Sequence, residues 1–177
     1  VEVADLFYLR TASDVQLSPD AARIVFTVQS NDRPGAPYTQ IWTADVSRGT
    51  AAPLAGGAEG SAPRWSSDGR SIAFIGAGDN GQAGIVVANA DGTNRAWITE
   101  VNGTNAPLPN VGERLAWSPD GRQIAYVSSE RGPEPDMDAD PIVITRYWWR
   151  PASSAGGRFN DNRRLHLYVV NVQTRQA

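Results

Sequence analysis

The sequence predicts an all-β protein, a partial β-propeller made of four-stranded antiparallel blades. An internal repeat is the first observation, because one segment recurs three times with a shared aspartate at Asp20, Asp68 and Asp120. These aspartates are 48 and 52 residues apart, close to the ~40–50 residues of a propeller blade. The copies read VQLSPDAARIVFTV, PRWSSDGRSIAFIG and LAWSPDGRQIAYVS.

Strand periodicity and turn chemistry are the second and third observations. Apolar β-branched and aromatic residues follow each aspartate, and Ile72 and Phe74 alternate with Ala73 and Ile75, so each copy predicts a strand with two apolar faces. The turn at 118–121 combines Pro, which presets φ, Asp, which bonds nearby amides, and Gly, which tolerates positive φ.

Two copies of the turn depart from this pattern. Ala21 stands where glycine is expected, and Ser67 stands where proline is expected. We therefore expect the first turn to be more strained or differently shaped.

A third strand follows each hairpin, and a short fourth strand follows in the first two units. The third strands are expected from Gln40, Gly84 and Leu165, and Leu54 and Ile98 are expected on the fourth strands. A short helix is expected within residues 1–10. Residues 1–177 then form one partial propeller domain, with blade one at about 13–56, blade two at about 60–100, and blade three at about 113–177, which contains an insertion at 130–164 and lacks a fourth strand.

Three blades cannot close a ring, since propellers use about four to eight. We therefore expect the chain to be a segment of a longer protein. The first residues have neither an initiator Met nor a secretory apolar run, which indicates a trimmed start. An open fan also leaves a sheet edge uncovered, which predicts self-association.

Composition excludes several classes of function. All sixteen basic residues are Arg, they form no cluster, and the net charge is −3, so we expect no nucleic-acid partner. No apolar run approaches the ~18 residues of a membrane span. The chain has no Cys, which excludes disulfides and Cys-ligated zinc but leaves both a periplasmic or other extracytoplasmic location and a cytoplasmic one open.

The residues offer no catalytic constellation and no cofactor site. His166 is the only histidine and lies on a predicted strand, so a packing role is the simpler interpretation. Gly76, Gly78 and Gly81 match the spacing of a dinucleotide fingerprint, but a strand follows them where the fingerprint needs a helix. We interpret them as a hairpin loop and assign no cofactor.

An acidic run in the insertion has the spacing of a calcium loop at Asp136, Asp138 and Asp140. Pro141 replaces the turning Gly and Tyr147 replaces the bidentate Glu, which excludes an EF-hand. A looser cation site stays open, but a solvated acidic loop is the simpler interpretation, and no metal site is assigned.

The insertion also contains a dense aromatic and cationic cluster. Such residues can clamp a peptide by stacking and by charge-assisted bonds to a carboxylate, although burial of the aromatics against blades two and three is the simpler interpretation. We keep these residues as candidate substrate contacts. They are Arg146, Tyr147, Trp148, Trp149 and Arg150.

Trp65 and Trp117 occupy equivalent positions in the second and third repeats. We expect both to pack between neighbouring blades.

The repeats resemble those of TolB-type periplasmic proteins and of the prolyl oligopeptidase family of serine peptidases. The stretches DADPIVITRYWWRP and RFNDNRRLHLYVVNV resemble the third blade of the acylaminoacyl-peptidase and dipeptidyl-aminopeptidase branch. This resemblance implies an N-terminal propeller region that caps a C-terminal α/β-hydrolase domain with a Ser-Asp-His triad. No G-x-S-x-G elbow occurs in these residues, so we expect that domain to be absent and this chain alone to be inactive.

Two functions from different classes follow. In the first, the chain is the non-catalytic propeller segment of a bacterial oligopeptidase or exopeptidase, whose partners are short peptides and the hydrolase domain. In the second, it is a stand-alone TolB-type propeller that binds a protein partner. A propeller lyase or glycosidase is disfavoured, because it would need clustered histidines or paired carboxylates.

Overall fold

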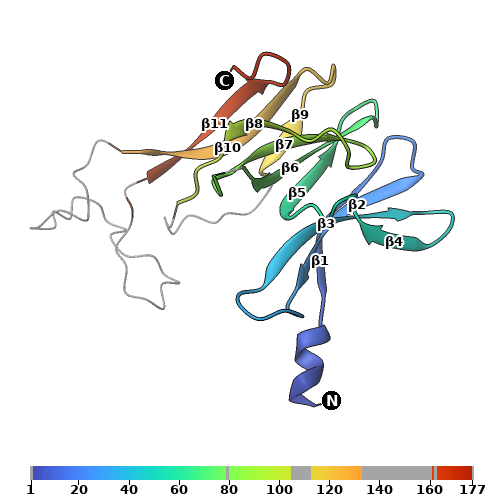
Figure 1. The fold of residues 1–177 in the computed structure, drawn as a ribbon. Helices are drawn as coiled ribbons and strands as arrows, with labels where there is room; N and C mark the ends of the chain where they lie inside the picture. The colour runs from blue at the N-terminus through green and yellow to red at the C-terminus, as the bar shows by residue number, and fades with distance from the viewer. Residues whose placement is uncertain (1, 79, 105–112, 133–160, 162, 177) are drawn as a thin grey trace, which may run out of the picture.

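The computed structural model describes residues 2–78, 80–104, 113–132, 161 and 163–176. Within them the protein forms three antiparallel sheets of four, four and three strands, and in each sheet the strands are hydrogen-bonded in chain order (Figure 1). The only helix in the described part of the chain is short and lies at the N-terminus. The predicted fold class, an all-β partial propeller with an incomplete third blade, is confirmed.

The elements follow the predicted order. The 3-10 helix η1 covers Val3–Tyr8, and sheet one contains β1 (Thr11–Leu17), β2 (Arg23–Ser30), β3 (Tyr38–Asp45) and β4 (Thr50–Pro53). Sheet two contains β5 (Gly60–Trp65), β6 (Ser71–Ala77), β7 (Ala83–Asn89) and β8 (Ala96–Glu100). Sheet three contains β9 (Leu115–Trp117), β10 (Gln123–Arg131) and β11 (Arg163–Asn171).

The fourth strands differ slightly from the expectation. Ile98 lies on β8 as predicted, whereas Leu54 is the residue after β4. Leu54 is nevertheless buried, with 2% of its surface exposed, and its amide donates to the Ile41 carbonyl at 2.8 Å. The apolar side chain is thus used for packing beyond the end of the strand.

The repeated Ser-x-Asp turn has the same construction in all three sheets. In the first, the Ser18 hydroxyl donates to Asp20 Oδ1 at 2.6 Å, and the same carboxylate oxygen accepts the Ala22 amide at 3.1 Å. The bond from Ser18, and to a lesser extent the bond from Ala22, hold the pKa of Asp20 below its ordinary value. The pKa values of Asp68 and Asp120 are lowered for the same reason, because each carboxylate accepts a hydrogen bond from the serine two residues before it.

Of the two alternatives expected for the first turn, the structure shows strain and not a different shape. Ala21 has a φ of 58°, beside 67° for Gly69 and 69° for Gly121, and the amides of all three donate at 2.9 Å to the equivalent serine carbonyl. The turn therefore keeps its shape, and the strain is borne by an alanine in the left-handed region.

The first strands of sheets one and two each contain a bulge, and the bulges join the two blades. The register shifts between Ser13 and Gln16 in β1 and between Ser61 and Arg64 in β5. The Gln16 side-chain oxygen accepts the Trp65 amide at 2.6 Å. A side chain of β1 therefore satisfies a backbone donor of β5, the edge strand of sheet two.

The core lies in two layers, one on each face of sheet two. Ile72 and Phe74 of β6 join the cluster shared with sheet one, whereas Ala73 and Ile75 join the cluster shared with sheet three. This alternation is the predicted one. It shows that sheet two is buried on both faces, as a middle blade must be.

Both repeat tryptophans pack between sheets, as predicted. Trp65 belongs to the core between sheets one and two, and the Arg23 guanidinium lies 4.8 Å from its ring centroid. Trp117 packs against the core between sheets two and three, and its Nε1 donates to the Arg64 carbonyl at 3.1 Å.

The outer faces of sheets one and three have no blade against them in the described part of the chain. Phe26 and Trp42 pair on the outer face of sheet one, with their ring centroids 6.5 Å apart. On sheet three, Leu167 and Val169 are 74% and 47% exposed. Both end faces therefore present apolar side chains. Among the described residues, no helix has the length and apolar character of a membrane span.

Candidate functional site

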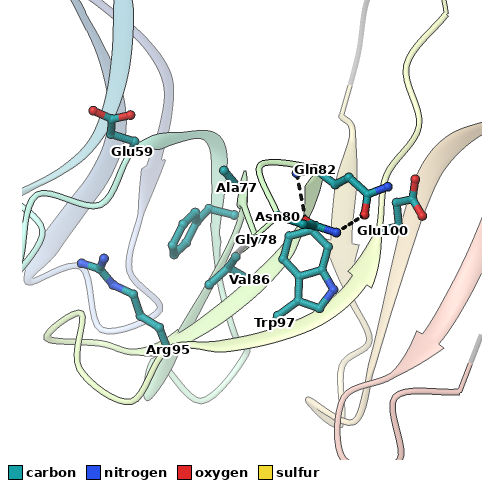
Figure 2. Close-up of a pocket in the computed structure, with 11 residues that line it drawn as sticks. Glu59, Ala77, Gly78, Asn80, Gln82, Val86, Arg95, Trp97 and Glu100 are labelled. Carbon is teal, nitrogen blue, oxygen red and sulfur yellow. Dashed lines mark hydrogen bonds between the residues drawn. The ribbon is translucent and has the colours of Figure 1, made fainter.

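A hollow of about 660 Å³ opens at the boundary between sheets one and two (Figure 2). It lies at the end of sheet two where the hairpin between β6 and β7 turns, and its lining combines aromatic, aliphatic, amide and charged side chains. The lining residues are Glu59, Phe74, Gly76, Ala77, Gly78, Asn80, Gln82, Val86, Arg95, Trp97 and Glu100.

Two glycines allow the Trp97 indole to lie across the sheet. A Cβ atom at Gly78 would stand 2.8 Å from the indole ring, and one at Gly84 would overlap both the ring and the Thr99 carbonyl oxygen. The indole thus covers the backbone of β7 and of the hairpin, and the half-buried ring also lines the hollow. Trp97 is a flat aromatic surface with glycine backbone beneath it.

The glycine-rich hairpin is held by its own hydrogen bonds. The Gly78 amide donates to the Gln82 carbonyl at 2.9 Å, and the Gln82 amide donates to Asn80 Oδ1 at 3.1 Å. Asn80 Nδ2 in turn donates to Gln82 Oε1. Strand β7 follows directly. The prediction of a hairpin loop is therefore confirmed, and of the three glycines Gly78 is the one that lies against the indole.

The charged groups of the hollow differ in what they already bind. Arg95 donates from Nη2 to the Ala55 carbonyl and from Nε to the Gly92 carbonyl at 3.2 Å, and Figure 2 shows it directed away from Trp97. Glu59 forms an ion pair with Arg33 at 2.8 Å, and both side chains are about half exposed. Glu100 is exposed and has no ion-pair partner among the described residues.

A second hollow of about 360 Å³ adjoins the first. The two share Glu59, Gly76 and Ala77 as lining residues, so they meet at the end of β6. The second hollow also includes Tyr38 of sheet one, whose ring lies 3.5 Å from the Arg33 guanidinium carbon. Together the two hollows form a groove with Trp97 in one part and Tyr38 in the other.

Polar contacts fix the Tyr38 end of the groove. The Tyr38 hydroxyl donates to Asp32 Oδ1 at 2.7 Å, and Arg10 approaches the other Asp32 oxygen at 3.2 Å. The Tyr38 bond, and then the Arg10 bond, lower the pKa of Asp32, while the same carboxylate raises the pKa of Tyr38.

His166 lies on β11 opposite Ser128, is exposed, and has its ring edge-on to Tyr168 at 6.4 Å. It therefore occupies the strand position expected of it. The neighbouring Tyr168 stacks on Tyr126 at 5.5 Å, and its hydrogen bond with Glu130 raises its pKa to about 12.

The candidate substrate contacts Arg146, Tyr147, Trp148, Trp149 and Arg150 lie outside the described residues, as do Asp136, Asp138 and Asp140. Among the described residues, no three His, Asp or Glu side chains gather as metal ligands would. Sequence reasoning noticed the glycines of the hairpin but missed Trp97 and Glu100. A tryptophan on β8, the second strand after the glycine-rich hairpin, was the available signal.

Comparison with known proteins gives a consistent result for the fold. No family model matches the chain. An uncharacterized peptidase of Bacillus subtilis, YuxL, is 29% identical over 128 residues, which cover 71% of this chain and 18% of the relative. The Tol-Pal system protein TolB of Alcanivorax borkumensis is 37% identical over 70 residues, which cover 40% of this chain and 14% of the relative.

Solved structures match over almost the whole chain. The acylaminoacyl peptidase of Pyrococcus horikoshii superposes with a TM-score of 0.70 at 20% identity, over 97% of this chain and 25% of that one. The β-propeller domain of the Trilobed protease of Pyrococcus furiosus superposes with a TM-score of 0.56 at 15% identity, over 94% of this chain and 41% of that one.

The chain thus spans less than a fifth of the curated relatives that it matches and a quarter of the acylaminoacyl peptidase. The fold, the repeats and the extent of the match agree with the resemblance found in the sequence. The chain is a partial β-propeller similar to the propeller of acylaminoacyl peptidases, with repeats of the TolB type.

Proposed function

We propose that the chain is the non-catalytic propeller segment of a serine peptidase that acts on short peptides, and that it gates substrate access to a hydrolase domain outside these residues. The observation that carries the proposal is the backbone match to acylaminoacyl peptidase over 97% of the chain. The similarity to the peptidase YuxL over 71% of the chain supports it independently.

The physical basis of gating is the way the blades pack. Sheet two is buried on both faces, so neighbouring blades leave no lateral gap through their core. A ring closed from such blades admits substrates only through its openings, which favours short peptides over folded proteins. Arg146 and Arg150 are the proposed contacts for a peptide carboxylate.

The experiment compares this chain with the full-length protein. Chromogenic aminoacyl and acyl-aminoacyl substrates report turnover, and a fluorophosphonate label reports an activated serine. We expect labelling and turnover in the longer protein alone. Labelling of this chain by itself would overturn the proposal.

Gating requires a second measurement on the full-length protein. We expect kcat/KM to fall steeply as a peptide series grows in length, and folded proteins to resist cleavage. The Arg146→Ala variant should weaken binding of short peptides without changing the fold, as judged by circular dichroism. A flat length series would contradict gating, and unchanged kinetics would contradict the role of Arg146.

The alternative function is a TolB-type propeller that binds a protein. The 37% identity to TolB over 70 residues favours this alternative. It would be selected if the full-length protein took up no serine-directed label and had no peptidase turnover.

The end face of sheet three supports self-association of this chain. Leu167 and Val169 expose apolar surface on the edge strand β11, which a second copy can cover. Sedimentation should show a concentration-dependent oligomer that the Leu167→Arg variant disperses. A stable monomer at every concentration would contradict self-association.

A further inference from the structure

We propose that the groove between sheets one and two binds a short peptide that carries an arginine or lysine side chain, with the cationic group lying over the Trp97 indole. The proposal that the groove binds such a peptide does not depend on the proposed function. The role of the groove in selecting cationic peptides rests on that function and deepens it.

The groove has the extent of a peptide site. The hollows of about 660 and 360 Å³ are connected through Glu59, Gly76 and Ala77. The larger hollow alone, at about 660 Å³, has the size of a ligand site. Phe74 and Val86 supply the apolar wall beside the indole.

Trp97 provides the surface that a cation recognises. Its ring is supported from below by Gly78 and Gly84, so it cannot tilt down into the sheet. The ring also lines the hollow. The face of an indole carries negative charge density, and guanidinium and ammonium groups bind over it when they lie within ~6 Å of the centroid.

The charges of the lining favour a positively charged ligand. Glu100 is exposed and has no ion-pair partner among the described residues. Arg95, the one cation among the described residues of the lining, already donates to the carbonyls of Ala55 and Gly92. Glu59 is shared with Arg33, so we expect it to contribute less than Glu100.

An acidic peptide would fit this arrangement poorly. Its carboxylate would meet Glu100 and the negative face of the Trp97 indole, while the donors of Arg95 are occupied. A neutral peptide could fill the apolar wall but would gain neither the cation–π contact nor the attraction to Glu100.

The first test is a titration of the 177-residue chain with acetyl-Gly-Arg-Gly-amide, followed by calorimetry and by the indole NH signals in NMR. Citrulline in place of arginine keeps the size and hydrogen-bonding shape of the side chain and removes its charge. We expect the arginine peptide to bind at least about tenfold more tightly, with the larger shift at the Trp97 signal. Equal binding of the two peptides, or no binding of either, would overturn the proposal.

Variants then locate the site. Trp97→Leu and Glu100→Gln should each weaken the arginine peptide several-fold, with Glu59→Gln weaker in effect. Glu2→Gln removes an exposed carboxylate from the N-terminal end of the chain and is the matched control. Unchanged affinity in both Trp97→Leu and Glu100→Gln would place any binding elsewhere and refute the assignment.

A pair of glycine variants tests the platform itself. Gly84→Ala should displace the Trp97 ring and weaken binding, because the added Cβ overlaps it. Gly103→Ala is the control, since a Cβ there meets nothing within 4 Å. If Gly84→Ala fails to fold, the exposed Glu100→Gln variant still tests whether the arginine peptide binds in the groove.

The outcomes separate this proposal from the proposed function. Binding of the arginine peptide to a chain whose full-length parent has no peptidase activity would support the groove and reject the peptidase. The full-length protein could instead cleave arginine and citrulline substrates equally well while this chain binds neither peptide. That result would support the peptidase and reject the groove.

Discussion

The boundary between sheets one and two opens into a hollow at one end, whereas at the equivalent end of the boundary between sheets two and three hydrogen bonds join the described residues. The repeat aligns Gly76 and Ala77 of β6 with Ser128 and Ser129 of β10. Ser128 Oγ accepts the Asn102 amide at 2.9 Å, and the Ser129 hydroxyl donates to the Gly103 carbonyl at 2.5 Å. These bonds fasten the segment after β8 to sheet three.

At the first boundary Gly76 and Ala77 can make no such bonds from their side chains, and they line the hollow instead. The difference teaches that two equivalent blade boundaries can have the same apolar core and different ends. Glycine and alanine thus stand at the boundary with a candidate ligand site, and two serines stand at the boundary with hydrogen bonds to the segment after β8.

The largest expected effect concerns the shared core. Phe74→Ala should lower the free energy of unfolding by about 3–5 kcal/mol, the usual loss for a buried phenylalanine, because its ring is 2% exposed between sheets one and two. Urea unfolding measures the change. Phe7→Ala, at a residue 55% exposed, should leave the midpoint nearly unchanged. A small effect of Phe74→Ala would mean that the hollow replaces the core at this boundary.

The second prediction concerns the boundary between sheets two and three, where Ser128 is replaced by the glycine that the repeat has at position 76. Ser128→Gly leaves the Asn102 amide without its acceptor, at about 1–3 kcal/mol, and adds the cost of glycine in a strand, about 0.5–1 kcal/mol. We expect a total loss of about 1.5–4 kcal/mol in urea unfolding.

The reverse change, Gly76→Ser, is the matched comparison. A Cβ there would stand 3.0 Å from the Phe74 ring and 3.2 Å from Val86. We expect it to narrow the hollow and to weaken binding of the arginine peptide. Full stability of Ser128→Gly would show that the hydrogen bond from Asn102 to Ser128 does not hold the segment after β8 on sheet three.

The third prediction sharpens the comparison among the three turns. Ala21→Gly should raise the free energy of unfolding by about 0.5–1 kcal/mol, since relief of the left-handed strain, about 1–2 kcal/mol, exceeds the entropy that glycine adds to the unfolded chain, about 0.4–1 kcal/mol. Thermal unfolding measures it. Ala22→Gly, beside it without positive φ, should destabilise, and a gain there would contradict the explanation.

The smallest expected effect is the acid dependence of these turns. Asp20, Asp68 and Asp120 have pKa values lowered in the folded protein, so they add stability above the unfolded value, near pH 4, and lose it as the pH falls through the folded values. Each carboxylate is exposed, so solvent screening keeps each contribution small.

The measurement is the urea midpoint at pH 7 and at pH 3. Replacing the three aspartates with asparagine should reduce the difference between the two midpoints. An unchanged difference would assign the acid sensitivity to other carboxylates such as Asp32, whose pKa is also lowered.

The sequence predicted the fold well, because repeats, alternation and turn chemistry are local signals. Ile72 and Ala73 face opposite cores as their alternation indicated. The first turn is strained and keeps its shape, one of the two outcomes expected for it, because serine and aspartate impose the turn even when an alanine must adopt positive φ.

The candidate site was much less predictable. Trp97 lies thirteen residues beyond Gly84 in the sequence but above it in the sheet, and only the strand pairing brings them together. Glu59 and Glu100 reach the same hollow from the two opposite edges of sheet two. The hollow results from the small size of Gly76 and Ala77, and a missing side chain leaves no periodic signal in a sequence.

The order of strands within each sheet has a consequence for how the chain folds. Because each strand pairs with the one before it, almost every hydrogen-bonded partner is close in sequence, which keeps loop-closure entropy low. A blade can therefore form as soon as its own residues leave the ribosome, and each new blade then docks on a finished surface. Synthesis from the N-terminus and assembly of the fan proceed in the same direction.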